Sequence, residues 1–265
     1  MKCGNNLKQL ALAALNYENQ NGSFPPGSMG QSPSTHQYPT PSKPRHPLCV
    51  FILPFLEEGN RFAAYDFSKH FHQQQSIIGS KLAIYHCPSD TSRRQYVADD
   101  DFNEYKGNYG VNWGQLKYSD QGQKAPFEIE YGATMADIRD GTSNTLLFLE
   151  MLQAPADASN PIDRRGRIWN DDSACYQIMT RYPPNSTVPD NGRCVDRPEQ
   201  RLPCTNSDNA GRLEHFLTSR SQHAGGVVVA QCDGSVQFRS NSIDATTWKA
   251  ASSIAGGEVI DASKL

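Results

Sequence analysis

A single stretch of this chain has the periodicity of a long amphipathic helix, and a proline pair ends it. Apolar residues recur at the i, i+3, i+4, i+7 and i+8 positions of one helix face, namely at Leu7, Leu10, Ala11, Ala14 and Leu15. Gly22 follows the polar residues 19–21 and is a typical helix end, and Pro25 and Pro26 prevent continuation. The chain holds 20 glycines and 17 prolines, so we expect short elements and long connections beyond this helix.

The composition excludes some classes of function. The chain has 265 residues, enough to bury a core, and its formal net charge of −3 gives no electrostatic basis for binding nucleic acid. Only 37% of the residues are hydrophobic, no run reaches the roughly 18 apolar residues of a membrane span, and the first 20 residues are too polar for a signal peptide. We therefore expect a small, aromatic-rich core beneath much loop.

The remaining pattern predicts an α+β fold, with one amphipathic helix followed by several strands and hairpins that are joined by long connections. Two β-branched runs flank an Asp-Gly turn at Asp233 and Gly234, the strongest hairpin signal in the chain. Further strands are predicted at 108–113, 145–149 and 166–169, and short helices at 61–67, 76–85 and 243–254. The apolar run 48–53 fits a strand or a helix, residues 28–47 are expected to form an irregular loop, and residues 170–222 are expected to form a long insertion.

The seven cysteines favour disulfides in an exported protein, because the sequence contains no C-x-x-C pair typical of zinc or thioredoxin-like chemistry. Cys194 and Cys204 flank a short loop rich in proline, asparagine and aspartate, where a local disulfide would compensate for a small core. Seven is an odd number, so we expect at least one cysteine to stay free or to pair between chains.

Two sets of residues are candidate metal ligands. The aspartates Asp137, Asp140, Asp171 and Asp172 are weak calcium candidates, because their spacing matches no EF-hand loop and Asp140 precedes a Gly in what reads as a tight turn. The second set, a zinc alternative, consists of His70, His72, His86 and Cys87, whose spacing departs from the usual ligand pairs. No other cofactor is expected.

The segment around the predicted hairpin carries a histidine that invites a catalytic interpretation. We expect His223, Gly225, Gly226, Asp233 and Gly234 to be structural instead, with the glycines allowing close backbone approach and His223 bonding across the hairpin. Ser235 lacks a G-x-S-x-G elbow, and nothing in the sequence identifies a base and an orienting acid around it. No catalytic residue is predicted.

Several motifs occur in an order that resembles a known protein family. They are C-G-N-N-L-K-Q at 3–9, F-P-P-G at 24–27, I-L-P-F-L-E-E at 52–58, C-P-S-D at 87–90, N-Y-G-V-N at 108–112, I-R-D-G-T-S-N-T-L-L-F-L-E at 138–150, H-A-G-G-V-V-V-A-Q-C-D-G-S-V at 223–236 and A-G-G-E-V-I at 255–260. Together they resemble the planctomycete-type prepilin-like proteins, similar to type II secretion pseudopilins, with a C-terminal domain of unknown function. That domain is domain-of-unknown-function family 1559, also labelled bacterial solute-binding.

The resemblance implies an exported protein with a pilin-like fold, in which the N-terminal amphipathic helix packs on an antiparallel sheet with long loops and insertions. Members of this family usually begin with a prepilin leader and an apolar membrane helix, which we expect to precede this sequence in the full-length form. Residues 1–22 would then be the C-terminal part of that helix, and residues 23–265 a single α+β head. The resemblance also suggests that Cys3 pairs with Cys87, since each lies in one of its motifs.

The leading hypothesis is therefore a non-enzymatic pilin-like or pseudopilin-like protein of the cell envelope. Its partners would be other pilin-like subunits or envelope secretion components, with Leu7, Leu10, Ala14 and Leu15 packing on the sheet or on neighbouring subunits. The alternative is an extracellular module that binds a ligand such as a carbohydrate through Trp113, Trp169 and Tyr176 together with the loop 170–222.

Overall fold

The predicted N-terminal helix is the longest element of the structure. In the computed structural model, which describes residues 2–32, 44–91, 96–99, 102–120, 124–155, 163–207 and 209–258, helix α1 spans Lys2–Asn21. The helix ends where the sequence predicts, because Gly22 takes up a left-handed backbone conformation with φ of 83°. Leu7, Leu10, Ala11 and Ala14 of the apolar stripe are fully buried, as is Ala13, and Leu15 is partly buried against the same core.

The other elements are short, as the abundant glycine and proline predict. The remaining α-helices are α2 (Leu48–Ile52), α3 (Gly59–Ala64), α4 (Gln75–Ile78) and α5 (Ala245–Ala250), and the 3₁₀-helices are η1 (Leu53–Phe55), η2 (Phe71–Gln73), η3 (Ala83–Tyr85), η4 (Met135–Asp137), η5 (Pro198–Gln200) and η6 (Asn209–Glu214). The strands are β1 (Ser28–Met29), β2 (His46–Pro47), β3 (Tyr96–Asp99), β4 (Phe102–Tyr105), β5 (Tyr109–Asn112), β6 (Phe127–Glu128), β7 (Tyr131–Gly132), β8 (Leu146–Glu150), β9 (Gln177–Ile178), β10 (Asp190–Gly192), β11 (Cys204–Asn206), β12 (Gly226–Gln231) and β13 (Val236–Ser240). The expected α+β class is confirmed.

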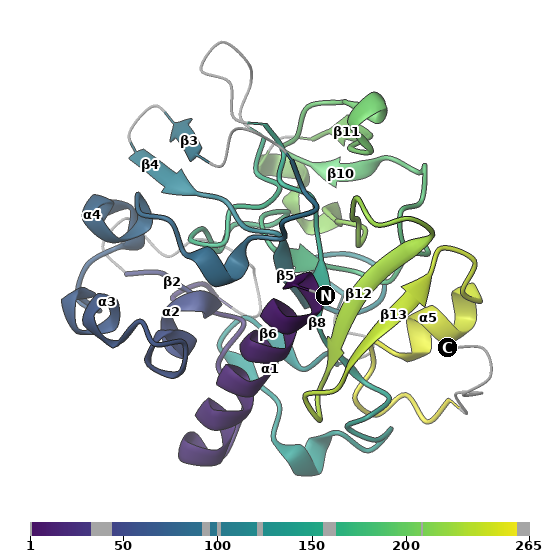
Figure 1. Ribbon diagram of the computed structural model, residues 1–265, viewed down its shortest axis with the longest axis horizontal. Coiled ribbons are helices and arrows are strands. Elements are labelled where there is room, and N and C mark those ends of the chain that lie inside the picture. The colour runs from purple at the N-terminus through teal and green to yellow at the C-terminus, as the bar shows by residue number, and fades with distance from the viewer. Residues whose placement is uncertain are drawn as a thin grey trace.

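A five-stranded sheet forms the centre of the molecule, with strand order β13-β12-β8-β5-β9. The first four strands are antiparallel to their neighbours, whereas β9 runs parallel to β5. Helix α1 lies against β12, β8 and β13 on one face of this sheet (Figure 1). Every residue of β8 is buried, so the central strand is covered on both faces.

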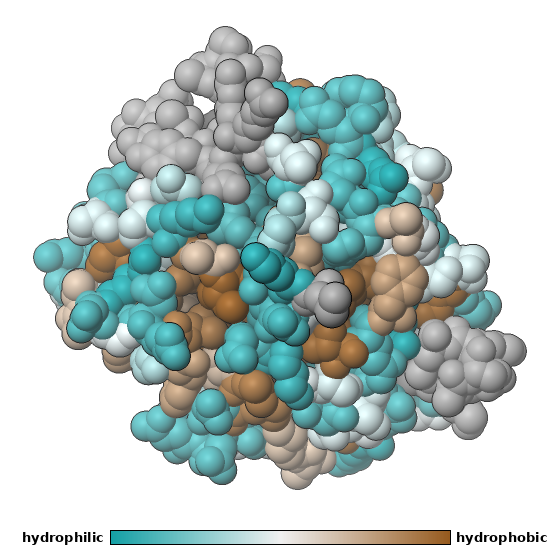
Figure 2. All heavy atoms as spheres, in the orientation of Figure 1, coloured by the Kyte–Doolittle hydropathy of each residue, from teal (hydrophilic) through white to brown (hydrophobic). Residues whose placement is uncertain are grey.

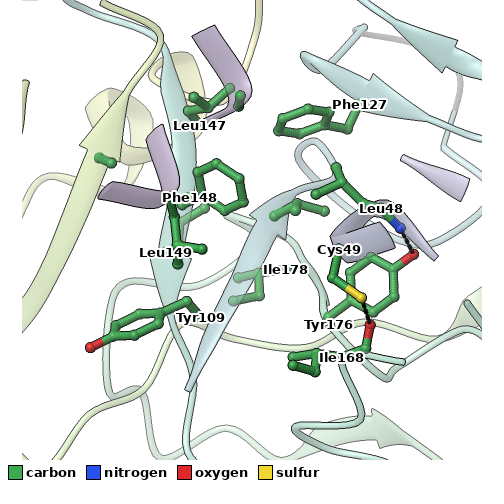
Figure 3. Close-up of a cluster of buried hydrophobic side chains, with 14 of the residues drawn as sticks. Leu48, Cys49, Tyr109, Phe127, Leu147, Phe148, Leu149, Ile168, Tyr176 and Ile178 are labelled. Carbon is green, nitrogen blue, oxygen red and sulfur yellow. Dashed lines mark hydrogen bonds between the residues drawn. The ribbon is translucent and has the colours of Figure 1, made fainter. Parts of the chain in front are cut away.

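The core extends from β8 to segments that lie far away in the sequence. Figure 3 shows Leu147, Phe148 and Leu149 in one cluster with residues of α2, β6 and β9. In that cluster the hydroxyl oxygen of Tyr176 accepts a hydrogen bond from the backbone N–H of Leu48. The Cys49 thiol donates a hydrogen bond to the carbonyl oxygen of Ile168. The ambiguous run 48–53 is thus helical and packs into the core.

Several predicted elements differ from the structure. The strand expected at 166–169 is absent; these residues form turns, and Gly166 has a left-handed φ of 93°. The helices expected at 76–85 and 243–254 are shorter, because Gly79 ends α4 and α5 reaches only Ala250. Within the expected loop 28–47, β1 pairs with β2, and residues 33–43 lie outside the described part of the chain.

The expected insertion 170–222 is not peripheral throughout. Gln177 and Ile178 form β9 at the edge of the central sheet, and both side chains are buried.

Ion pairs occupy part of the interior next to this segment. Arg165 binds Asp163 at 2.8 Å and Asp190 at 3.3 Å, and all three side chains are buried. Paired charges therefore replace part of the apolar core that the composition lacks.

No helix within the described residues is both long enough and apolar enough to cross a membrane.

The burial of α1 yields a test with a matched control on the same helix. Leu10 is fully buried, whereas Leu12 is 36% exposed. We expect Leu10→Ala to lower the free energy of unfolding by about 2–5 kcal/mol, because it leaves a cavity in the core that α1 covers. Leu12→Ala should change the free energy by less than about 0.5 kcal/mol. Urea unfolding of both variants measures the difference, and equal losses would mean that α1 does not pack as described.

Candidate functional site: a disulfide beside a buried glutamate and histidine

The first turn of α1 is linked covalently to the segment after η3. Cys3 and Cys87 form a disulfide with a Cα–Cα distance of 4.9 Å, the pairing that the resemblance suggests. Both cysteines are buried. Asn6, one turn along α1, donates from its side-chain amide to the carbonyl oxygen of His86 at 2.7 Å. The start of the helix is therefore attached to the 86–87 segment by a covalent bond and a hydrogen bond.

Two residues at the start of β5 position the two cysteines. The side-chain oxygen of Asn108 accepts the backbone N–H of Cys87 at 3.0 Å, and the Tyr109 hydroxyl donates to the carbonyl oxygen of Cys3 at 3.3 Å. Tyr109 is paired with Glu150 of β8 in the sheet register, so the two side chains share one face of the sheet. Cys3 lies over that same face.

Glu150 ends β8 and is a buried carboxylate, only 1% exposed. Its Oε2 atom accepts the backbone N–H of Val228 at 2.7 Å, and its Oε1 atom lies 3.0 Å from Nε2 of His223. Burial raises the pKa of Glu150 above its ordinary value, while the Val228 N–H and His223 oppose that shift. The carboxylate is thus oriented by the neighbouring strand and paired with a histidine.

His223 completes the cluster. Its Nε2 atom lies 3.7 Å from Sγ of Cys87, and Oε1 of Glu150 lies 3.6 Å from the same sulfur. Cys3, Cys87, Glu150 and His223, hereafter the disulfide site, offer ligand atoms that all lie within 4.8 Å of one another. Across the described part of the chain, this is the one group of three or more His, Cys, Asp or Glu side chains close enough to share a metal ion.

The glycines and the turn of the hairpin behave as the sequence predicts, but His223 does not. A Cβ atom at Gly226 would lie 2.1 Å from the carbonyl oxygen of Arg239, and Gly234 has a left-handed φ of 79°. The Asp233 carboxylate accepts the backbone N–H of Ser235 within the turn. His223, however, does not bond across the hairpin; its ring reaches Glu150 on β8, because the 223–225 turn directs it over the sheet.

The structure does not bring the four calcium candidates together. The Asp137 carboxylate accepts hydrogen bonds from the backbone N–H and the hydroxyl of Thr134, the N-cap residue of η4. The Asp140 carboxylate accepts the backbone N–H groups of Gly256 and Gly257. Asp171 binds Arg45 at 2.5 Å, and Asp172 binds Arg45 and Arg164. The arginines neutralise these two carboxylates, and this arrangement does not favour a calcium site at these positions.

In the second set of metal candidates the rings of His70 and His72 are neighbours, with centroids 4.5 Å apart, but His86 and Cys87 have other partners. The ring of His70 caps η2, and the ring of His86 lies 3.1 Å from the side-chain amide of Gln153. Cys87 joins the disulfide site rather than these histidines. The three aromatic side chains suggested for sugar binding, Trp113, Trp169 and Tyr176, are buried in the core and present no face to a ligand.

The other five cysteines do not belong to the disulfide site. Cys194 and Cys204 form the local disulfide that the sequence predicts, with a Cα–Cα distance of 6.0 Å. Cys49, Cys175 and Cys232 are free and buried, and burial raises the pKa of all three thiols. Their thiolate forms are therefore disfavoured.

A surface pocket borders the disulfide site. It has a volume of about 590 Å³ and is lined by Cys87 together with the side chains of Lys2, Asn6, Lys81 and His86, among others. The side chain of His223 is 23% exposed. The disulfide site is thus close to solvent although three of its four residues are buried.

Comparison with known proteins places the chain in a family. The sequence model of a family described as "Protein of unknown function (DUF1559)" matches residues 1–246. The chain belongs to this family. Comparisons of this DUF1559 chain with curated proteins and with solved structures each found no match.

All four residues of the disulfide site lie in motifs of the DUF1559 chain that carried the resemblance, at 3–9, 87–90, 138–150 and 223–236. Sequence reasoning missed the role of Glu150. The available signal was a carboxylate that ends an otherwise apolar run, T-L-L-F-L-E, where a buried strand was predicted. Such a residue needs a partner inside the protein.

The two disulfides should contribute unequally to stability. Cys3–Cys87 spans 84 residues of sequence and Cys194–Cys204 spans 10. If a cross-link acts by restricting the unfolded chain, we expect serine replacement of the first pair to cost about 4–5 kcal/mol and of the second about 3 kcal/mol. Urea unfolding of the two double variants gives both values, and a larger loss for the second pair would contradict this account.

His72 should make the protein sensitive to acid. Burial, with repulsion from His70 and Arg45, lowers the pKa of His72 to about 2. Below pH 6.5 the unfolded chain gains a proton at His72 that the folded chain does not, so stability falls as the pH falls. We expect His72→Gln to reduce the loss of unfolding free energy between pH 7 and pH 5 by about 2 kcal/mol. Identical losses in the variant and the parent, measured with urea, would disprove this.

Proposed function

We propose that this chain is the head of an exported, non-enzymatic pilin-like protein, and that α1 is the C-terminal part of a longer helix. In the full-length form that helix would hold the protein in the membrane before assembly. The proposal is supported by the resemblance of the sequence motifs to those of prepilin-like proteins, and above all by the way α1 is attached to the head.

The attachment of α1 suits a helix that carries load. A force applied through its N-terminal end would peel the helix from the sheet, starting at the first turn. Cys3, the second residue of α1, is covalently linked to Cys87. Further along, Lys8 donates to the carbonyl oxygen of Gly234 at 2.7 Å, in the hairpin turn. Peeling would therefore require a covalent bond to break before the buried stripe could separate.

The surface beside α1 offers apolar contact to a neighbouring subunit. Phe238 of β13 is 51% exposed and is paired with Val228 in the sheet register, so both lie on one face. Val228 is next to Gly4 of α1, which places Phe238 on the face that α1 partly covers. Figure 2 shows apolar side chains exposed on both flanks of the polar stripe of α1. A second pilin-like subunit or an envelope secretion component is the partner that we propose for this surface.

Export agrees with the two disulfides, because such bonds persist outside the reducing cytoplasm. This point supports the proposed cell-envelope location, and it bears equally on any extracellular protein.

Processing by a prepilin peptidase tests the proposal. The native gene, with the coding sequence upstream of this chain, is expressed in one bacterial host with a prepilin peptidase and in a matched host without it. We expect the mass of the N-terminal peptide to show cleavage of a leader and methylation of the new N-terminal residue only in the first host. An N-terminus that is the same in both hosts would overturn the proposal.

A further inference from the structure

The disulfide site contains more potential metal ligands than are needed to link α1 to Cys87. A disulfide that only fixed α1 would be satisfied by apolar neighbours, yet this one lies beside a buried carboxylate and a histidine. Cys, His and Glu are the residue types that bind zinc. The inference drawn from this site concerns the chain itself and is independent of the proposed pilin-like function.

The distances among these groups match those around a tetrahedral zinc ion. With Zn–S of about 2.3 Å and Zn–N or Zn–O of about 2.0 Å, neighbouring donor atoms lie about 3.3–3.8 Å apart. Sγ of Cys87 is already 3.7 Å from Nε2 of His223 and 3.6 Å from Oε1 of Glu150. Nε2 of His223 and Oε1 of Glu150, 3.0 Å apart, would have to separate by about 0.3 Å. The two sulfurs, joined by the disulfide, are too close to be separate ligands.

The surrounding groups orient the donors. The N–H of Val228 binds Oε2 of Glu150, which leaves Oε1 directed at His223 and Cys87. Asn108 fixes the backbone at Cys87, and Tyr109 fixes the backbone at Cys3. Such outer contacts are what metal sites use to hold their ligands.

We propose that reduction of the Cys3–Cys87 disulfide converts the disulfide site into a zinc site, with both sulfurs, Nε2 of His223 and Oε1 of Glu150 as ligands. The pocket of about 590 Å³ that Cys87 lines gives the reductant and the ion a route to the site. The two thiolates and the Glu150 carboxylate carry three negative charges, and zinc carries two positive charges. Lys2 and Lys81, which line the same pocket as Cys87, supply positive charge near the site.

The reaction balances with a dithiol as the reductant. One thiolate of the dithiol attacks a sulfur of the disulfide, and the second thiolate resolves the mixed disulfide. Two electrons pass to the protein, which gains two thiols, while the dithiol becomes a disulfide. Zn²⁺ then binds the two thiolates and two thiol protons leave to water. Nε2 of His223 binds the ion in the tautomer that carries the ring proton on Nδ1.

Cobalt(II) is the probe for the test, because tetrahedral thiolate coordination gives it a characteristic visible and near-ultraviolet spectrum. The chain is titrated with Co²⁺ before and after reduction by a water-soluble phosphine. We expect one Co²⁺ per chain with tetrahedral bands and a thiolate charge-transfer band after reduction, displacement of the cobalt by Zn²⁺, and no such bands in the oxidised chain.

Variants separate this site from other thiols. Glu150→Gln and His223→Ala should each weaken Co²⁺ binding about tenfold or more, since each removes a ligand. Cys3→Ser with Cys87→Ser should abolish the bands. Cys194→Ser with Cys204→Ser is the matched control, and it should keep the full spectrum after reduction. Circular dichroism checks that each variant is folded.

Three results would overturn the proposal. The first is the absence of tetrahedral Co²⁺ bands in the reduced chain, and the second is bands that survive loss of Cys3 and Cys87. The third is an affinity that is unchanged in both Glu150→Gln and His223→Ala. If reduction unfolds the chain, the proposal requires Co²⁺ or Zn²⁺ to restore the circular dichroism spectrum, and failure to do so also counts against it.

Discussion

The burial of the apolar stripe of α1 against β12 and β8 is the interaction on which the rest of the structure depends. It brings Cys3 to the face of the sheet that carries Tyr109 and Glu150. Without that packing, Cys87 would have no partner from the N-terminal helix, and the carboxylate of Glu150 would lose its cover. The helix in turn depends on the sheet, because an isolated helix of this length with so many polar residues is marginal in water.

Paired charges allow a chain with few apolar residues to remain folded. Arg167 binds Glu104 and Arg220 binds Asp190, and all four side chains are buried. Lys106 is fully buried and donates to the carbonyl oxygens of Ala154 and Asp163 at 2.8 and 2.7 Å. These groups fill the region around residues 163–172 where the sequence predicted a strand and an insertion. Buried ion pairs contribute little net stability but are costly to break, so they define how these loops are arranged.

The parts of the fold that were predictable from sequence are those with a local signal. Helix α1, strand β8 and the β12–β13 hairpin have their own periodicity or turn residues, and each is found close to the predicted residues. Strand β9 has only two residues and forms because β5 provides its hydrogen-bonding partners. No local sequence pattern therefore predicts it. The disulfide site is non-local in the same way. Glu150 is 63 residues from Cys87 and 73 from His223, and only the sheet brings these residues together.

The Cys3–Cys87 disulfide and the proposed metal site are compatible, because both hold Cys3 close to Cys87. The sulfurs of a disulfide are about 2.05 Å apart, and two thiolates on a tetrahedral zinc are about 3.8 Å apart. Opening the disulfide therefore moves the first turn of α1 by less than about 2 Å, a shift that leaves Leu7 and Leu10 in the core. The two states differ in the bonds that link Cys3 to Cys87. The disulfide is opened by reduction, whereas the metal site also releases its ligands when the ion is removed. The redox state would then decide whether the attachment of α1 depends on the supply of metal.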